Sequence, residues 1–454
     1  MSETPEREQS TRRTLARLNH AFKTMRPAKL LLFGYVLYIV IGWALLSLPF
    51  AQVDAIGALD NLFIATSAVS TTGLVTVDPG QSYTFFGELV ILLLIQLGGL
   101  GYMTVGSFAV LTLQDRLGSA RRQTTKAAFG LPDDISPASF IKSVVAFTLI
   151  CEAVGAAVLF WFFTQAGVDD ALWTAIFHAI SAFCTAGFSL FSDSLMGFRD
   201  HAGVNIVISA LSIFGAMGFL IIVDVWRTAL GRKKWLGFTS KVIVRMTALM
   251  LAIGTLIIFV AEPTITPLPA SERLLASFFQ AMTAATTVGF NTHPIGTLAP
   301  AIIMVFFVLM IIGASPAGTG GGIKTTSLAA LIGLVRSTIK GRDQIRFFKR
   351  RVPMDKLQNA AATLAYYMAL LTLAMFLLLL TEQGAAFDVL MFEAISAMGT
   401  VGLSMGITGD LTDLGKLIVI VLMTAGRVGI LTFGIALAAG DETREEEADN
   451  DLVL

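Results

Sequence analysis

One sequence pattern occurs four times in this chain, at residues 61–76, 175–190, 277–292 and 390–405. Each copy has a Phe, a Ser or Thr, an Ala and a Thr at fixed distances before a Gly, and a Leu or Phe follows that Gly. The intervals between successive glycines are 114, 102 and 113 residues, a regularity that composition alone does not explain. The pattern therefore predicts four related structural units in one chain.

Eight longer apolar segments lie around these copies, near residues 30–50, 86–112, 143–164, 204–226, 243–261, 300–335, 360–381 and 414–438. Each is long enough to cross a bilayer core of ~30 Å as a helix, the form in which one segment satisfies its own backbone amides in lipid. Charged residues make up 14% of the chain, against about 25% in soluble proteins. We predict an all-α polytopic membrane protein with eight transmembrane helices, and the low charge argues against a soluble enzyme.

Basic residues are concentrated in alternate connections between these segments. The connections at 1–29, 113–142, 227–245, 336–356 and 439–454 contain 27 of the 32 Lys and Arg residues. Loops rich in Lys and Arg stay in the cytoplasm, so we expect both termini to be cytoplasmic and the chain to cross the cell (inner) membrane several times. The charged first thirty residues lack the pattern of a signal peptide, so the first apolar segment is expected to be a retained span.

The four repeated patterns lie in the opposite, outward connections. Their helix-like stretches are about a dozen residues long, too short to span, which indicates re-entrant helices buried in protein or lining a water-filled cavity. We predict four non-identical helix, pore-helix, helix repeats around a pseudo-fourfold central pore. The expected divisions are a cytoplasmic tail (1–29), repeat 1 (30–112), repeats 2 to 4 each with a preceding cytoplasmic loop (113–226, 227–335 with a broken last helix, and 336–438), and an acidic cytoplasmic tail (439–454).

The glycine of each pattern has two interpretations. In a single copy it is most simply a helix C-cap, with the preceding Thr bonded locally. Four equivalent helix ends around one axis favour a cation site instead, because helix C-termini carry partial negative charge and exposed carbonyls can replace an ion's hydration shell. The candidate ion selectivity filter is Thr71, Thr72, Gly73, Leu74, Thr185, Ala186, Gly187, Phe188, Thr287, Val288, Gly289, Phe290, Thr400, Val401, Gly402 and Leu403, with K⁺ held by the four threonines that stand two residues before a Gly and by the four glycines.

A Gly-rich stretch, GASPAGTGGGIKT at 313–325, interrupts the sixth apolar segment. Five Gly and a Pro do not maintain a stable helix, so either a long tilted helix kinks here or an intramembrane loop lies across the pore and moves to open it. We favour the loop. Ile323 separates Gly322 from Lys324, which argues against a Walker A phosphate loop. The candidate gate consists of Gly313, Ala314, Ser315, Pro316, Ala317, Gly318, Thr319, Gly320, Gly321, Gly322, Lys324 and Arg427.

Two basic residues lie inside apolar segments. Lys324 is expected to pair with loop carbonyls or a carboxylate, or to approach the cytoplasmic mouth. A guanidinium at the membrane midplane costs at least ~2.5 to 3.5 kcal/mol, so Arg427 should face a partner or a cavity. Arg427 is therefore either part of a structural salt bridge or borders the pore, where it repels cations or holds the loop closed.

The fourfold Thr-x-Gly-(Phe/Leu) pattern, with GGGIKTT at 320–326 and GRVG at 426–429, resembles the Trk/Ktr/HKT superfamily of potassium transporters. The resemblance is closest to the pore-forming membrane subunit of bacterial Ktr systems, because the chain has eight apolar spans and lacks two additional leading ones. It implies potassium uptake, a gating role for the 313–325 stretch, a homodimer in membrane lipid, and a cytosolic ring of RCK-type (KtrA-like) regulatory subunits that carries the nucleotide. It implies no covalent cofactor, K⁺ as the substrate ion, and Na⁺ as a familiar activator.

Other functions stay open or are disfavoured. A Na⁺-permeable or weakly selective cation carrier of the same superfamily is the main alternative. A secondary transporter with a midplane site is disfavoured because all four repeats run in the same sense. The motifs lack a paired nucleophile and base, so we expect no enzyme. Lys plus Arg and Asp plus Glu are balanced at 32 each, which gives no reason to expect nucleic acid.

Several remaining residues have a supporting interpretation. Cys151 and Cys184 lie in apolar segments and exclude a disulfide framework or structural zinc. His178 and Glu393 occupy equivalent repeat positions and are expected to brace the pore helices. The acidic residues after the patterns either line a vestibule that concentrates cations or are solvated loop charges; they are Asp78, Asp193, Asp200, Asp410 and Asp413. The basic loops and the acidic tail are the candidate docking surface for cytosolic subunits.

Overall fold

The computed structural model describes residues 27–114, 137–219, 236–316, 318–342, 344–347 and 350–437, together with 221, 224, 225 and 228. The expected N-terminal tail up to residue 26, the acidic tail from 438, most of the 113–142 connection and the gate candidate Ala317 lie outside the described residues. The described chain is mainly helical, which confirms the predicted helical class. Its one departure is a hairpin in which β1 (Arg346–Phe347) pairs antiparallel with β2 (Arg350–Arg351), with Arg346 opposite Arg351.

The main helices follow one another in four sets, each with a short helix between longer or interrupted ones. The sets are α2 (Pro27–Leu46), α3 (Ala58–Val69) and α5 (Phe85–Gln114); α7 (Pro137–Gln165), α8 (Ala171–Phe183) and α9 (Ala202–Met217); α11 (Phe238–Ala261), α12 (Ala270–Thr286), α13 (Pro300–Ile311) and α14 (Thr325–Ile339); and α15 (Met354–Thr381), α16 (Phe387–Gly399), α17 (Asp413–Val428) and α18 (Ile430–Leu437). Smaller turns are η1 (Pro49–Ala51), α4 (Pro79–Ser82), η2 (Met196–Phe198), η3 (Ile295–Thr297) and η4 (Thr408–Asp410).

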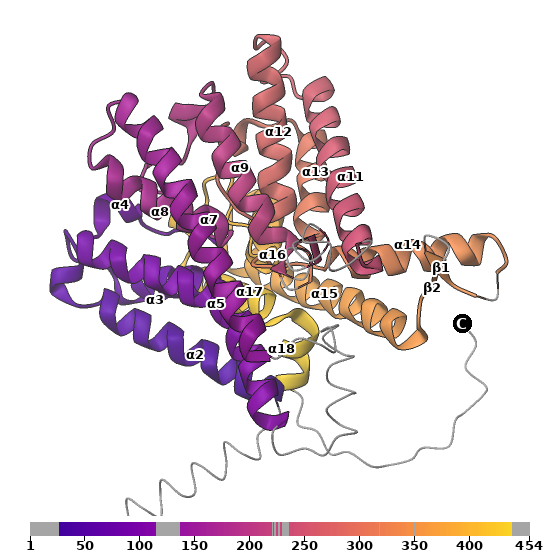
Figure 1. Cartoon of the computed structure of the whole chain (residues 1–454). Helices are drawn as coiled ribbons and strands as arrows, with labels where there is room; N and C mark the ends of the chain where they lie inside the picture. The colour runs from indigo at the N-terminus through magenta and orange to yellow at the C-terminus, as the bar shows by residue number, and fades with distance from the viewer. Residues whose placement is uncertain are drawn as a thin grey trace, which may run out of the picture.

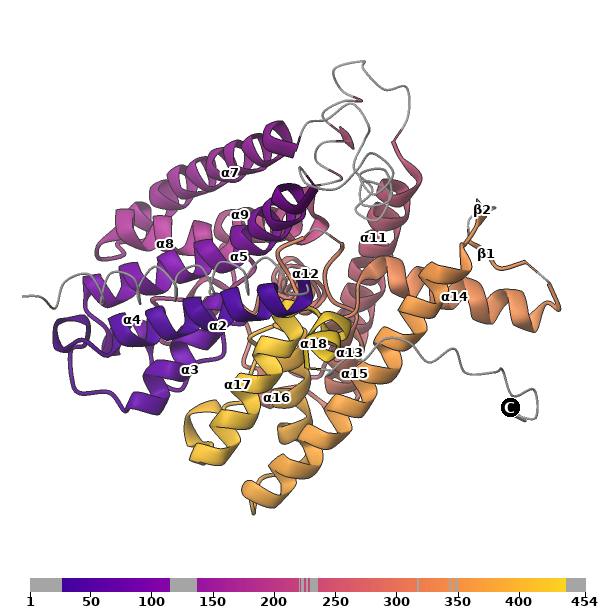
Figure 2. The ribbon, with the colours of Figure 1, turned by 90° about the horizontal axis from the view of Figure 1, so that it is seen from below.

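Three described helices are long and apolar enough to cross a membrane, at Ser143–Gln165, Phe238–Ala261 and Met354–Thr381. They lie on the outside of the molecule, where Figures 1 and 2 show α7, α11 and α15. Large apolar side chains on their outer faces are exposed, for example Leu256 and Phe376. A polar solvent does not suit such faces, whereas lipid does. The apolar helices indicate an integral membrane protein.

Of the other predicted spans, those at 204–226, 300–335 and 414–438 do not form one continuous helix over their whole length. Glycines end two of them, because α9 stops before Gly218 (φ 83°) and α17 stops before Gly429 (φ 95°), both in backbone conformations that favour glycine. The pair α17 and α18 bends by 107° at this break. Residues 312–324 separate α13 from α14. Eight continuous apolar segments therefore do not become eight uninterrupted helices.

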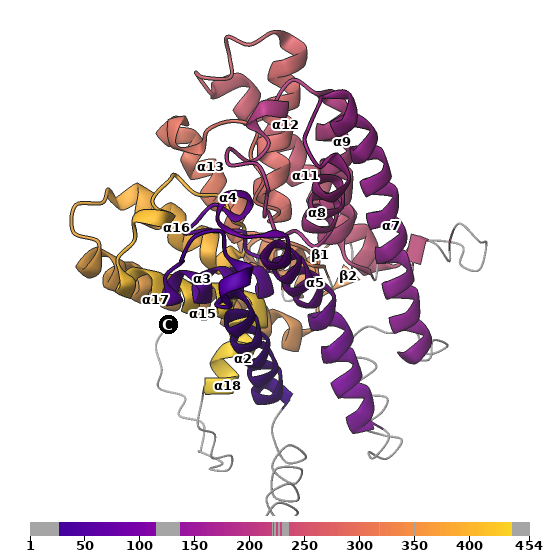
Figure 3. The same ribbon diagram turned by 90° about the vertical axis from the view of Figure 1, so that its left-hand side faces the viewer.

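The short helices α3, α8, α12 and α16 form the centre of the molecule. Nearly all residues of their last two turns are buried, including the small and hydroxyl-bearing ones. Figure 2 shows α12 nearly end-on near the middle of the view, with other helices around it. Figure 3 shows α5 and α7 running beside each other toward one end of the molecule, where the first residues of α2 also lie. The hairpin and α14 protrude from the body (Figure 1).

Candidate functional site

A threonine just after each of the four short helices has the same unusual backbone conformation. The threonines after the helices have positive φ, at 51° for Thr71, 52° for Thr185, 58° for Thr287 and 49° for Thr400. The glycines two residues later also have positive φ, between 68° and 90°. A β-branched residue rarely adopts such a φ, so four equivalent cases mark a shared, strained turn.

The hydrogen bonds that hold these turns are equivalent as well. The amide before each glycine donates to the carbonyl of the Ser or Thr that the pattern places six residues before that glycine. These bonds join Thr72 to Ser67 (2.8 Å), Ala186 to Ser181 (2.8 Å), Val288 to Thr283 (3.1 Å) and Val401 to Ser396 (2.8 Å). The repeated sequence pattern thus corresponds to a repeated main-chain geometry.

The four glycines touch one another's loops in a closed circle. A Cβ added to Gly73 would overlap the carbonyl oxygen of Ala186, and one added to Gly187 would overlap that of Val288. In the same way Gly289 abuts the carbonyl of Val401, and Gly402 abuts the carbonyl of Thr72, which returns to the first loop. The structure therefore brings all four candidate loops together, and none of these positions has room for a side chain.

The side chains around this ring separate into a polar and an apolar set. The residues after the glycines, Leu74, Phe188, Phe290 and Leu403, are buried in the surrounding core. The four turn threonines are also buried, yet the hydroxyls of Thr287 and Thr400 have no hydrogen-bond partner among the described residues. Buried hydroxyls normally have a partner, so these oxygens suit water or a cation.

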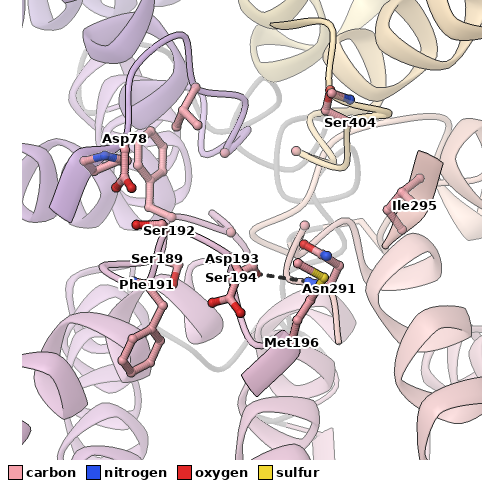
Figure 4. A pocket seen from close by; sticks show the side chains of 18 of the residues that line it. Asp78, Ser189, Phe191, Ser192, Asp193, Ser194, Met196, Asn291, Ile295 and Ser404 are labelled. Carbon is pink, nitrogen blue, oxygen red and sulfur yellow. Dashed lines mark hydrogen bonds between the residues drawn. The ribbon is translucent and has the colours of Figure 1, made fainter. Parts of the chain in front are cut away.

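A cavity of about 490 Å³ opens onto the ring and is lined by all four glycines. Figure 4 shows its side chains, among them Asp78 and Asp193, and the hydrogen bond from the amide of Asn291 to the hydroxyl of Ser194. The other three acidic candidates, Asp200, Asp410 and Asp413, are not among its lining residues. Only part of the acidic set therefore faces this cavity.

Three short helices bind the loop that follows their own glycine through one equivalent side chain. This side chain belongs to the residue after the Phe of the pattern. His178 Nε2 lies 2.9 Å from Ser189 Oγ, Gln280 Nε2 donates to the carbonyl of His293 (3.1 Å), and Glu393 Oε2 accepts from Ser404 Oγ (2.9 Å). The sequence indicated His178 and Glu393 but missed Gln280, although its position in the pattern is the same. The fourth equivalent residue is Ile64, which makes no such bond.

His293 itself lies in the loop after Gly289, where its Nε2 is 2.7 Å from Thr264 Oγ1. Burial lowers the pKa of this imidazole, and the positive charge of Arg199 lowers it further, while the negative charge of Glu262 acts in the opposite direction. The neutral form is therefore favoured in the folded protein.

The described residues between α13 and α14, 313–316 and 318–322, fold back as a loop on the other side of the ring from the cavity. The amide of Ala314 donates to Gly321 (3.2 Å), Ser315 Oγ lies 3.1 Å from Thr325 Oγ1, and Gly322 has a φ of 69°. A Cβ on Gly313 would overlap the carbonyl of Gly321. Pro316 lies in the described turn.

The tip of this loop contacts all four turn threonines. Thr71 Oγ1 donates to the Thr319 carbonyl (3.5 Å), and Thr185 Oγ1 donates to Thr319 Oγ1 (3.0 Å). Gly320 and Gly321 lie so close to the hydroxyls of Thr287 and Thr400 that a Cβ would overlap them. The loop therefore packs against the ring at all four turn threonines.

Half-buried Lys324 and buried Arg427 both bind carbonyls of this loop. Lys324 Nζ donates to Gly320 (2.7 Å) and Gly321 (3.3 Å). Arg427 is 4% exposed and donates from Nη1 to the carbonyl of Thr319 and from Nη2 to that of Gly98 on α5. The contacts of Lys324 match the first of its expected alternatives, pairing with loop carbonyls. Arg427, on α17, connects the loop to α17 and α5.

Comparisons with known proteins agree on one family. The TrkH family model, described as "Cation transport protein", matches residues 38–443. Ktr system potassium uptake protein B of Vibrio alginolyticus is 36% identical over 420 residues, which is 91% of this chain and 92% of that protein. The potassium/sodium uptake protein NtpJ of Enterococcus hirae is 33% identical over 426 residues, 91% of this chain and 93% of that protein. The crystal structure of the potassium transporter TrkH from Vibrio parahaemolyticus has a similar fold, with a TM-score of 0.71 and 20% identity over 89% of this chain and 85% of that one.

Proposed function

Because the chain belongs to the TrkH family of cation transport proteins, we propose that it takes up potassium ions through the ring of four Thr-x-Gly loops. The observation that carries this proposal is the closed circle of glycine contacts, in which the carbonyl before each glycine meets the glycine of a neighbouring loop. Carbonyls fixed around one axis can replace the hydration shell of a monovalent cation. The four loops then act as a selectivity filter in a pseudo-fourfold pore formed by eight crossing segments.

The second part of the proposal is that the loop 313–322, here called the gate loop, closes this pathway. Its tip contacts all four turn threonines, so an ion leaving the ring meets protein on the axis. Lys324 and Arg427 bring positive charge to the same place and bind the loop's carbonyls. Potassium can pass only when the loop moves away, and the two cations stabilise it in place.

Relatives support the choice of ion and of a partner. Two proteins that are 36% identical to this chain are named Ktr system potassium uptake protein B, a name that implies a multi-component system. We propose a homodimer in the cytoplasmic membrane with both termini inside, and a cytosolic nucleotide-binding regulatory ring. The exposed basic residues of the hairpin, Arg346, Arg350 and Arg351, suit its docking.

A second candidate function is a sodium-permeable carrier of the same family. The observation that favours it is the potassium/sodium name of the Enterococcus hirae relative, which covers most of this chain. A filter with one glycine per loop also has fewer ordered carbonyl sites than a longer one. Selectivity for K⁺ over Na⁺ therefore has to be measured, with and without Na⁺ as an activator.

The test is ion flux into liposomes that contain the purified protein alone. We expect K⁺ uptake that exceeds Na⁺ uptake, and a large rise in K⁺ uptake when residues 317–321 are deleted. Thermal stability in detergent shows whether the deletion variant is folded. A folded deletion variant with wild-type flux would refute the gate, whereas equal or greater Na⁺ uptake in the wild type would favour the second candidate.

A further inference from the structure

We propose that Gly218 is a positioning residue for the gate loop, because it ends α9 where two helix carbonyls become available to that loop. This inference rests on the proposed gating function and adds a second element to it. Gly218 follows the last residue of α9 and has φ 83° and ψ 154°, a region that is nearly exclusive to glycine. The helix therefore stops at a residue that other side chains do not replace without strain.

The two carbonyls that this break releases are both used by the gate loop. The amide of Thr319 donates to the carbonyl of Gly215 (3.1 Å), and the amide of Ser315 donates to that of Ala216 (3.0 Å). In an uninterrupted α-helix these carbonyls would accept from the amides four residues later, the first of which is Phe219. Continuation of α9 and docking of the gate loop therefore compete for the same acceptors.

The gate loop packs directly against α9. A Cβ on Gly318 would overlap the carbonyl of Ala216, and a Cβ on Gly215 would overlap the carbonyl of Phe183 at the end of α8. Thr319 Oγ1 donates to that same Phe183 carbonyl at 3.2 Å. One loop residue thus binds α9 through its amide and α8 through its side chain.

Helical backbone resumes after the break. Residues 219, 221, 224, 225 and 228 are helical, and Asp224 Oδ2 accepts from the Gly237 amide (2.6 Å) and the Ser240 hydroxyl (2.7 Å) at the start of α11. Helical backbone thus stands directly on both sides of Gly218, at Met217 and Phe219, so the helix can continue through this position. Such a continuation withdraws both acceptors from the gate loop and releases it.

Gly218→Ala tests the competition, because alanine disfavours the broken backbone and favours a continuous helix. We expect partner-free K⁺ flux in liposomes to rise about tenfold and the amides of the gate loop to exchange hydrogen faster. Gly384→Ala is the matched control, since Gly384 also has a positive φ (108°) but lies in the turn between α15 and α16. Nothing lies within 4 Å of a Cβ at Gly384. A folded Gly218→Ala protein with flux no greater than the Gly384→Ala control overturns the inference.

An opposing variant covers the case in which Gly218→Ala does not fold. Phe219→Pro has no amide to offer the Gly215 carbonyl, so its gate-loop amides should exchange more slowly than those of Phe219→Leu, which retains the amide. Equal or faster exchange in the proline variant overturns the inference. Deletion of 317–321 separates the two proposals: if the deletion raises flux and Gly218→Ala does not, only the role of Gly218 fails, and if the deletion has no effect, the gate itself fails.

Discussion

The four loops of the ring are alike, whereas the four helices that follow them are not. The loops share the positive φ of the threonine, the same amide-to-carbonyl bond and the same glycine contact with the next loop. Among the following helices, α5 continues for 30 residues, α9 ends at Gly218, residues 312–324 separate α13 from α14, and α17 bends at Gly429. Symmetry is confined to the part that would coordinate an ion.

The difference between the two regions has a physical reason. A cation on the axis needs oxygen ligands at similar distances on every side, so the four loops are required to have the same geometry. A gate requires a segment with two arrangements, and a single interrupted helix supplies one without disturbing the other three. Proposed selectivity and proposed gating therefore reside in different elements that meet at the turn threonines, and substitutions should separate them.

The largest effect is expected in the ring, from Gly289→Ser. Its Cβ would overlap the carbonyl of Val401 and push it from the axis, which should lower K⁺ over Na⁺ discrimination about tenfold or more. Flux of both ions into liposomes measures this ratio. Gly197→Ser is the control, because nothing lies within 4 Å of a Cβ there. An unchanged ratio in a folded Gly289→Ser protein would remove this loop from the filter.

The next effect concerns the gate alone, in Arg427→Gln. A unit charge ~6 Å from an ion contributes about 3 kcal/mol at an effective dielectric of ~20, so its removal should raise K⁺ flux about tenfold or more with little change in the ion ratio. Arg336→Gln removes the same charge from an exposed site on α14. In combination with the 317–321 deletion the gain should be less than additive. Lower thermal stability without a gain in flux would leave Arg427 a structural role only.

A smaller effect is expected for Lys324→Met, which removes two bonds to the gate loop. Hydrogen bonds from a charged donor are worth about 1.5–3 kcal/mol, but a gate held by several other contacts should open only a few times more often. Partner-free K⁺ flux should rise modestly, and Lys340→Met, at the exposed end of α14, should leave it unchanged. A change in the K⁺ to Na⁺ ratio would break the separation between the two regions.

The smallest effect is expected for the pH dependence of thermal stability, through His293 in the loop after Gly289. The pKa of His293 is lowered in the folded protein, so its contribution to stability is present above the unfolded value of about 6.5 and is lost as pH falls toward the folded pKa. His293→Gln should reduce the loss of thermal stability between pH 7.5 and 5 by only about 1–2 °C. An identical pH dependence in the two proteins would show that His293 does not titrate in this range.

The helical class and the meeting of the four loops were predictable because the pattern is repeated, and chance does not place the same Thr and Gly four times. The break at Gly218 was not, since one glycine in an apolar run costs a helix only about 1 kcal/mol. The carbonyls that accept hydrogen bonds from Arg427 were equally unpredictable, because Gly98 and Thr319 lie far from it in sequence. Contacts between distant segments depend on packing that a local pattern does not contain.

The ring is built from one polypeptide, and this fact affects how it can change by mutation. In an assembly of four identical subunits every substitution appears four times, so a position is altered on all sides or on none. Here each quarter is encoded separately. The position after the repeated Phe already differs among the four quarters, with Ile64, His178, Gln280 and Glu393 in its four occurrences. A chain of this kind can adjust its preference for an ion in steps of one quarter, and lineages can explore intermediate filters that a tetramer of identical subunits never forms.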